Sequence, residues 1–152
     1  QYKATNVVYA KNTTGVSVSM DIALAYPTEA AVKKYERKFD FDQSKNTIQL
    51  FENYEMLEWK SPLVQSFLVF IKPTIEKPGQ LSFALQDGAS VTFKYDAKLF
   101  DIAIEDKLLD DERISGIWGK QLYRIQLVAK GNKKVGKHNF SIALINKSNS
   151  TQ

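Results

Sequence analysis

Apolar and polar residues alternate along most of this chain, and this alternation limits its fold more than any other feature. The apolar residues Val16, Val18, Met20 and Ile22 are separated by Ser17, Ser19 and Asp21. Successive side chains of a β-strand point to opposite faces, so a period of two predicts a strand with one buried face. The same alternation recurs over residues 122–129 and 138–145. An all-β fold is therefore expected.

About ten segments have a strand-like pattern and are separated by turn residues such as Asn, Gly and Pro. They lie around residues 4–10, 16–22, 35–41, 47–58, 67–71, 81–85, 91–95, 100–105, 122–129 and 138–145. The run Phe67–Ile71 is apolar throughout, which predicts a central strand covered on both faces. Thr28 can cap a short helix through Lys34, the one helical alternative. Together the segments predict a two-sheet antiparallel β-sandwich of about ten strands.

The 152 residues fit one domain with a sizeable core. We expect a single β-sandwich domain over residues 1–146 and a polar, disordered tail over 147–152. No apolar run approaches the roughly 18 residues of a membrane span. Gln1 is not a start residue, so we expect a mature or excised fragment, with any targeting segment upstream.

Cysteine is absent and His138 is the only histidine, which leaves little material for catalysis or metal binding. A His/Cys metal site normally needs at least two such ligands, and the acidic stretch Asp110–Glu112 lacks the spacing and glycine of a calcium loop. No Gly-x-Ser-x-Gly turn is present, and no pair of carboxylates stands out for glycoside hydrolysis. We therefore predict no catalytic residue, no metal and no cofactor. His138 shares strand parity with Phe140, so we expect a half-buried structural histidine.

A net charge of +4 makes the chain mildly basic, which is compatible with an acidic polymer as partner. Nucleic acid is not expected, because no basic stretch is interleaved with aromatic residues. The best candidate for a weak carbohydrate contact is the predicted turn at Trp118, with Lys120 and Arg113 near it in sequence. Exposed tryptophans stack on sugar rings, but Trp118 can equally seal the edge of the core. Arg37 shares a strand face with aromatic residues, which favours a structural role.

Two segments resemble a known family. Ser19–Ala30 (SMDIALAYPTEA), followed by the strand with Arg37, resembles the late part of heparinase II/III-like polysaccharide lyases of gut Bacteroidetes. Leu109–Arg113 (LDDER) and Trp118–Ile125 (WGKQLYRI) resemble a later stretch of the same proteins. In that family an α/α toroid and a following β-sandwich form the cleft that cleaves acidic polysaccharide by β-elimination. The resemblance implies that this chain is the C-terminal part of the β-sandwich region.

None of the family's catalytic or metal-binding residues has a counterpart here. The resemblance instead carries over Asp21, Tyr26, Pro27 and Arg37, whose expected role is to shape the sheet, with Asp21 as the expected partner of Arg37. It implies a non-catalytic accessory domain that packs on an upstream catalytic domain of the same polypeptide and extends a groove for an acidic glycan such as a glycosaminoglycan. A periplasmic, cell-surface or secreted location follows from the same family. The alternatives are an independent carbohydrate-binding module and a small stand-alone glycan hydrolase.

Overall fold

The computed structural model describes residues 2–86 and 88–146, so the tail expected over residues 147–152 lies outside the described part. The described residues form eleven strands: β1 (Thr5–Lys11), β2 (Gly15–Asp21), β3 (Val32–Asp42), β4 (Thr47–Met56), β5 (Val64–Val69), β6 (Thr74–Lys77), β7 (Gln80–Ala84), β8 (Ser90–Lys94), β9 (Phe100–Leu108), β10 (Gln121–Ala129) and β11 (Val135–Ile145). Two single-turn 3₁₀ helices, η1 (Ala23–Ala25) and η2 (Thr28–Ala30), connect β2 to β3, and one α-helix, α1 (Glu112–Trp118), connects β9 to β10. None of these helices is long and apolar enough to span a lipid bilayer.

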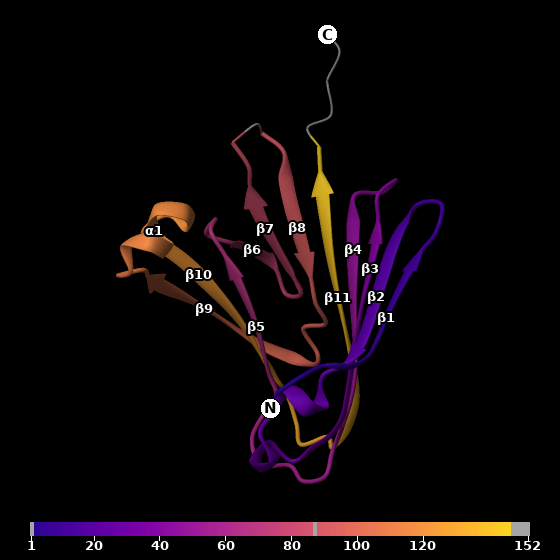
Figure 1. The fold of residues 1–152 in the computed structure, drawn as a ribbon. Coiled ribbons are helices and arrows are strands. Elements are labelled where there is room, and N and C mark those ends of the chain that lie inside the picture. The colour runs from indigo at the N-terminus through magenta and orange to yellow at the C-terminus, as the bar shows by residue number, and fades with distance from the viewer. Residues whose placement is uncertain (1, 87, 147–152) are drawn as a thin grey trace.

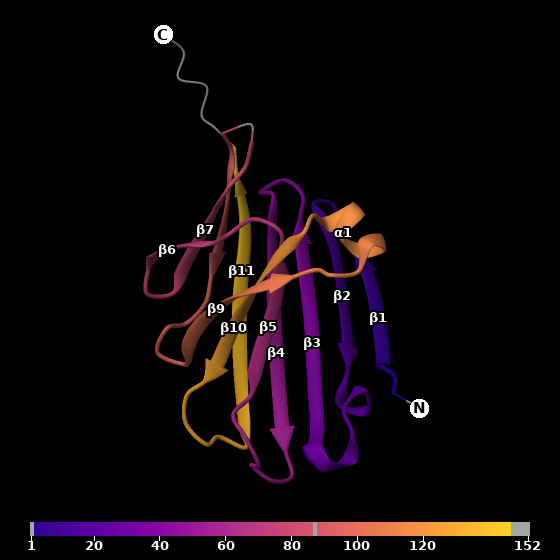
Figure 2. The ribbon, with the colours of Figure 1, turned by 90° about the vertical axis from the view of Figure 1, so that its left-hand side faces the viewer.

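The strands form two antiparallel sheets of very different width. The large sheet has eight strands in the order β1-β2-β3-β4-β11-β8-β7-β6, and the small sheet has three in the order β5-β10-β9. Figure 1 shows the sheets close together at the lower end and diverging upward, and Figure 2 shows the small sheet crossing in front of the large one at a steep angle. The two-sheet antiparallel sandwich predicted from the alternation is confirmed.

The core lies where the small sheet covers the middle of the large one. Its fully enclosed residues include Leu81 from the large sheet and Ile125 and Leu127 from the small one. Phe67 of β5 contacts Phe140 of β11 edge-to-face, with ring centroids 5.4 Å apart. Large apolar side chains that interdigitate in this way supply most of the stability of a sandwich.

The inner face of the large sheet stays apolar beyond the edge of this core. One row of paired residues runs across five strands: Phe140 (β11), Leu50 (β4), Phe39 (β3), Val18 (β2) and Tyr9 (β1). Along the row the exposed fraction rises from 1% at Phe140 and 5% at Leu50 to 37% at Phe39 and 63% at Tyr9. The alternation that makes β1–β3 amphipathic therefore leaves apolar residues of these three strands exposed to solvent on the inner face.

The structure corrects the interpretation of the run Phe67–Ile71. These residues do not form a central strand: β5 is an edge strand of the small sheet, and Leu68 and Phe70 are each 63% exposed. Among the described residues no third layer covers the outer face of the small sheet, so the outward residues of β5 stay in contact with solvent. A short apolar run cannot by itself distinguish these two situations.

One local prediction is also wrong, and one alternative is not realised. The turn expected at Trp118 is the end of α1, which Asp111 caps by accepting a hydrogen bond from the Arg113 backbone N–H at 2.9 Å. The helix considered from Thr28 to Lys34 does not form, because Ala31 adopts a left-handed conformation with φ of 53° and the chain enters β3 at Val32. The short strand β6 brings the described strands to eleven.

Candidate functional site

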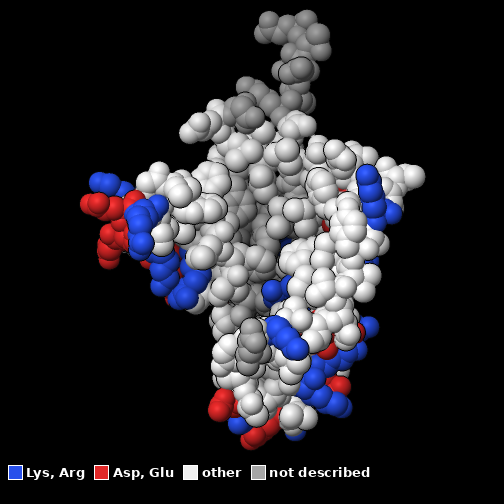
Figure 3. Space-filling model, in the orientation of Figure 1, with Lys and Arg blue, Asp and Glu red and all other residues white. Residues whose placement is uncertain are grey.

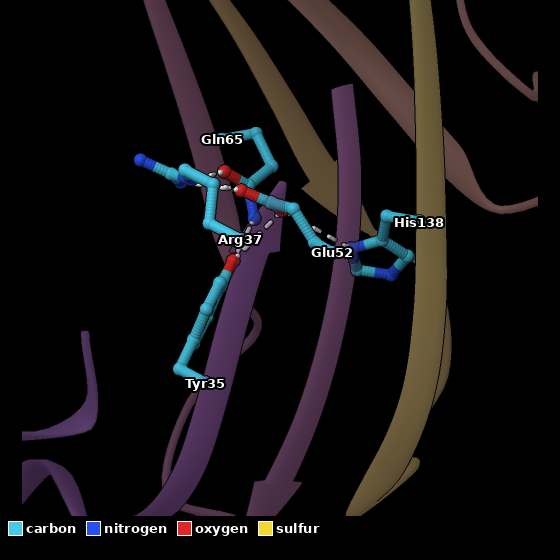
Figure 4. Close-up of polar contacts among 5 residues, drawn as sticks. All are labelled: Tyr35, Arg37, Glu52, Gln65 and His138. Carbon is cyan, nitrogen blue, oxygen red and sulfur yellow. Dashed lines mark hydrogen bonds and ion pairs between the residues drawn. The ribbon is translucent and has the colours of Figure 1, made fainter. Parts of the chain in front are cut away.

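Polar side chains gather on the inner face of the large sheet, between the apolar core and the exposed apolar residues of β1–β3. Figure 4 shows Tyr35 and Arg37 from β3, Glu52 from β4, Gln65 from β5 and His138 from β11 converging there. The strand register places Arg37, Glu52 and His138 side by side, because Arg37 pairs with Glu52 and Glu52 pairs with His138. The cluster therefore forms one polar row beside the apolar row of Leu50 and Phe140.

Glu52 is the centre of the cluster and has no solvent-exposed surface. Its Oε1 accepts a 2.7 Å hydrogen bond from Arg37 Nε and a second bond from Arg37 Nη2. Its Oε2 accepts a 2.9 Å hydrogen bond from the Tyr35 hydroxyl, which in turn accepts one from Gln65 Nε2. A buried carboxylate is tolerated only when it is paired and hydrogen-bonded in this way. The resemblance suggested Asp21 as the partner of Arg37, and that expectation is wrong.

Burial, followed by the charge of Glu52, raises the pKa of Tyr35 well above its usual range. The Tyr35 hydroxyl therefore stays protonated near neutral pH and donates its hydrogen bond to Glu52. Because Tyr35 is 1% exposed, no polymeric substrate reaches it directly. Its position makes it a structural element of the cluster.

His138 is more enclosed than expected, with 4% of its surface exposed. Its ring packs 5.0 Å from the ring of Tyr54 and 4.6 Å from that of Phe100, measured between centroids. Its Nδ1 lies 4.0 Å from Glu52 Oε2 and has no hydrogen-bond partner among the described residues. Burial lowers the pKa of His138 to about 4, so the ring is neutral at pH 7. It is placed as a core histidine.

Three of the residues that the resemblance carried over, Asp21, Tyr26 and Pro27, lie at the β2–β3 connection beside this cluster, whereas Arg37 lies within the cluster. Asp21 Oδ1 accepts hydrogen bonds from the backbone N–H groups of Ala23 at 2.9 Å and of Tyr35 at 3.2 Å, which ties the start of the connection to β3. Tyr26 stacks on Tyr35 with ring centroids 5.7 Å apart, and Pro27 follows in an extended conformation. Asp21 and Tyr26 therefore both hold the β2–β3 connection against Tyr35 of the cluster.

The residues proposed for a carbohydrate contact lie far from the cluster, around α1 (Figure 1). Trp118, 56% exposed, ends the helix, and Lys120 is exposed just after it. The guanidinium of Arg113 bonds to its own neighbour, with Nη2 2.9 Å from Asp111 Oδ2. This ion pair is at the surface, with the Arg113 side chain 90% exposed, so the guanidinium is still open to an acidic glycan.

Sequence reasoning missed Glu52 and Gln65. The signal for Glu52 was present, because Glu52 occupies a position between Leu50 and Tyr54 that the alternation assigns to the buried face. Gln65 gave no such signal, because it lies at the start of β5, just before the apolar run. Which carboxylate meets Arg37 depends on strand order, which alternation does not specify.

Metal binding has no support in the part of the chain that the structure describes. Within residues 2–86 and 88–146, no three His, Asp or Glu side chains gather in a way that could hold a metal ion. Figure 3 shows charged side chains mainly at the margins of the molecule, while the walls of the hollow between the sheets are largely uncharged. Uncharged residues therefore line most of this hollow.

No protein-family model and no curated protein matches the sequence. Solved structures do match. Heparan sulfate lyase HepC from Pedobacter heparinus aligns with a TM-score of 0.67 and 12% identity, over 99% of this chain and 23% of that one. The heparinase III BT4657 gene product aligns with a TM-score of 0.64 and 9% identity, over 99% of this chain and 22% of that one. This chain thus spans less than a quarter of the length of either protein. Identities this low establish the fold alone: the chain has the all-β fold of one part of the heparinase III structures, as the resemblance predicted.

Proposed function

We propose that this chain is a non-catalytic accessory domain of a heparinase II/III-like polysaccharide lyase and packs on the catalytic part of the same polypeptide. Two findings support the proposal together. The chain has the fold of one part of two lyase structures that are more than four times its length. The inner face of β1–β3, three of the eight strands of the large sheet, carries exposed apolar residues, as expected of a domain that buries this face against another.

The exposed apolar inner face of β1–β3 is the observation that carries the proposal. Tyr9, Phe39 and Phe41 are 63%, 37% and 39% exposed, on the same sheet face whose central residues are buried. Extended apolar patches of this kind mark contacts with another protein surface. The similar structures extend well beyond the aligned part, so the occupant we propose is the preceding region of the same polypeptide.

A non-catalytic role agrees with the chemistry of the buried cluster. β-Elimination needs a base and an acid that reach the sugar, typically with pKa values near the working pH. His138 is enclosed and has a pKa of about 4, and Tyr35 is enclosed and held as a donor to Glu52. Both groups stabilise the fold, and cleavage belongs to the remainder of the parent protein.

The end of α1 is the part of the chain that we expect to face a glycan. We propose that Trp118 and Lys120, with Arg113, form a weak carbohydrate contact that extends the groove of the parent lyase for an acidic glycan. The exposure of Trp118 is also the observation that favours the alternative, an independent carbohydrate-binding module. A lyase for an external polysaccharide works where the polymer is, so we place the parent in the periplasm, on the cell surface or outside the cell.

The test is a lyase assay on three proteins: the isolated chain, the parent protein, and the parent with this chain deleted. Heparin, heparan sulfate, chondroitin and alginate serve as substrates, and the unsaturated product is followed by its ultraviolet absorbance. The isolated chain should show no turnover and the parent should be active. Turnover by the isolated chain that His138→Ala abolishes would contradict the accessory role.

A further inference from the structure

A pocket of about 300 Å³ opens beside the buried cluster, and Trp118 is not among its lining residues. It lies between the β2–β3 connection and the segment that joins β4 to β5. One side is aromatic, formed by Tyr26 and Tyr35, and Gln65 lines the same pocket. The remaining lining residues are Glu29, Ala30, Val32, Met56, Lys60, Ser61, Pro62, Leu63 and Val64.

Tyr26 offers a rigid aromatic surface in this pocket. Its ring stacks on Tyr35 at an interplanar angle of 26°, and Tyr35 is itself fixed by its bonds to Glu52 and Gln65. Tyr26 nevertheless keeps 38% of its surface exposed, unlike Tyr35. Burial raises the pKa of Tyr26, so its hydroxyl stays protonated and can donate. An aromatic ring that is fixed before binding loses little conformational entropy when a ligand stacks on it.

Polar side chains that line the pocket with Tyr26 can form hydrogen bonds to sugar hydroxyl groups. Glu29, Lys60 and Ser61 are exposed lining residues, and they provide an acceptor, a donor and a hydroxyl that can do both. Lys60 is only loosely engaged, with its Nζ 3.6 Å from Glu58 Oε2. Sites for small molecules commonly combine one apolar surface with a few polar groups of this sort.

The charge of the pocket distinguishes between ligand classes. Glu29 and Lys60 carry opposite charges, so the lining offers no net attraction to sulfate. A wholly apolar ligand would instead favour the larger hollow of about 480 Å³ between β5 and β7–β8, where Ser66 is the only polar residue among the described lining residues. We propose that the pocket at Tyr26 binds one uncharged sugar ring, which stacks on Tyr26 and is hydrogen-bonded by Lys60, Ser61 and Glu29.

This site differs from the Trp118 contact in both position and ligand. It does not depend on docking of the catalytic part, because Tyr9, Phe39 and Phe41 do not line the pocket. A single ring gives a small contact, so the dissociation constant should be on the order of 1 mM. Binding should change little between low and high salt, because no net charge is neutralised.

The experiment is a titration of the chain with cellotriose, chitotriose and a heparin tetrasaccharide, followed by NMR shifts of the tyrosine rings. At least one neutral trisaccharide should shift the Tyr26 ring. Tyr26→Ala should weaken that binding at least about tenfold, and Tyr26→Phe should leave it within about threefold, because the ring supplies the stacking surface. Leu108→Ala, at an exposed apolar residue of β9 outside every proposed contact, is the control and should change nothing.

Thermal unfolding of each variant separates loss of the site from loss of the fold. If Tyr26→Ala unfolds, Lys60→Ala and Ser61→Ala, at exposed positions, provide the same test and should each weaken binding. The proposal is overturned if neither neutral trisaccharide binds, if Tyr26→Ala folds and binds as the wild type does, or if only the heparin tetrasaccharide binds. None of these results affects docking of the catalytic part, which is measured on different residues.

Discussion

Arg37 and Glu52 form an ion pair across β3 and β4, and the Glu52 carboxylate has no contact with solvent. The side chain of Arg37 is 27% exposed, so the pair joins the enclosed core to the open hollow. Removing the guanidinium would leave an unpaired charge in a region where water cannot replace it. Loss of this ion pair should therefore cost more stability than loss of an ion pair at the surface.

Arg37→Ala should lower the free energy of unfolding by about 2–4 kcal/mol, because Glu52 loses its charged partner. Urea denaturation monitored by circular dichroism measures the change. The matched control is Arg124→Ala, whose partner Glu105 is 36% exposed. An ion pair of that kind contributes less than about 1 kcal/mol. A loss below about 0.5 kcal/mol for Arg37→Ala would show that Glu52 is not dependent on the pair.

His138 should make the chain less stable as the pH falls from about 6.5 to 4. The folded state holds the pKa of His138 at about 4, whereas an unfolded histidine has a pKa near 6.5. Above that window the ring is neutral in both states and its contribution is complete. Within it the unfolded chain binds a proton first, and the stability lost approaches about 3 kcal/mol.

The measurement is the free energy of unfolding at pH 7.5, 6, 5 and 4 for the wild type and His138→Gln. Other acidic groups titrate in both proteins, so the difference between the two curves isolates His138. The wild-type curve should fall more steeply in this window. Parallel curves would mean that the ring is accessible to protons in the folded state.

Trp118→Ala should leave the free energy of unfolding within about 0.5 kcal/mol of wild type, because the side chain is exposed at the end of α1. If the α1 contact exists, the same variant should weaken binding of a sulfated oligosaccharide. That binding should be no tighter than roughly micromolar and should weaken further with salt. Titration at two salt concentrations checks both points, and binding that is insensitive to the substitution would place the glycan elsewhere.

The alternation of residues predicted the architecture because it records which face of each strand is buried. It could not predict how many strands each sheet contains, so the run Phe67–Ile71 was placed in a covered centre and not at an edge. The same limitation hid the partner of Arg37: pairing of Arg37 with Glu52 follows from strand neighbours and register. Glu52 itself was visible as a carboxylate at a buried position between Leu50 and Tyr54. The short helix ending at Trp118 was missed because two glycines, Gly116 and Gly119, suggested a turn.

Docking of the apolar inner face of β1–β3 on the catalytic part is tested most directly by measuring association. The two partners are this chain and the preceding region of its parent polypeptide, expressed separately. Isothermal titration calorimetry gives the dissociation constant for the wild type and for a double variant, Phe39→Lys with Phe41→Lys. The control is a second double variant, Ser17→Lys with Ser19→Lys, which adds the same two charges on the opposite face of β2. The account predicts association that the double variant weakens at least about tenfold and the control leaves unchanged, because only the former places charge in an apolar interface. Absence of association, or equal affinity for all three proteins, would contradict it.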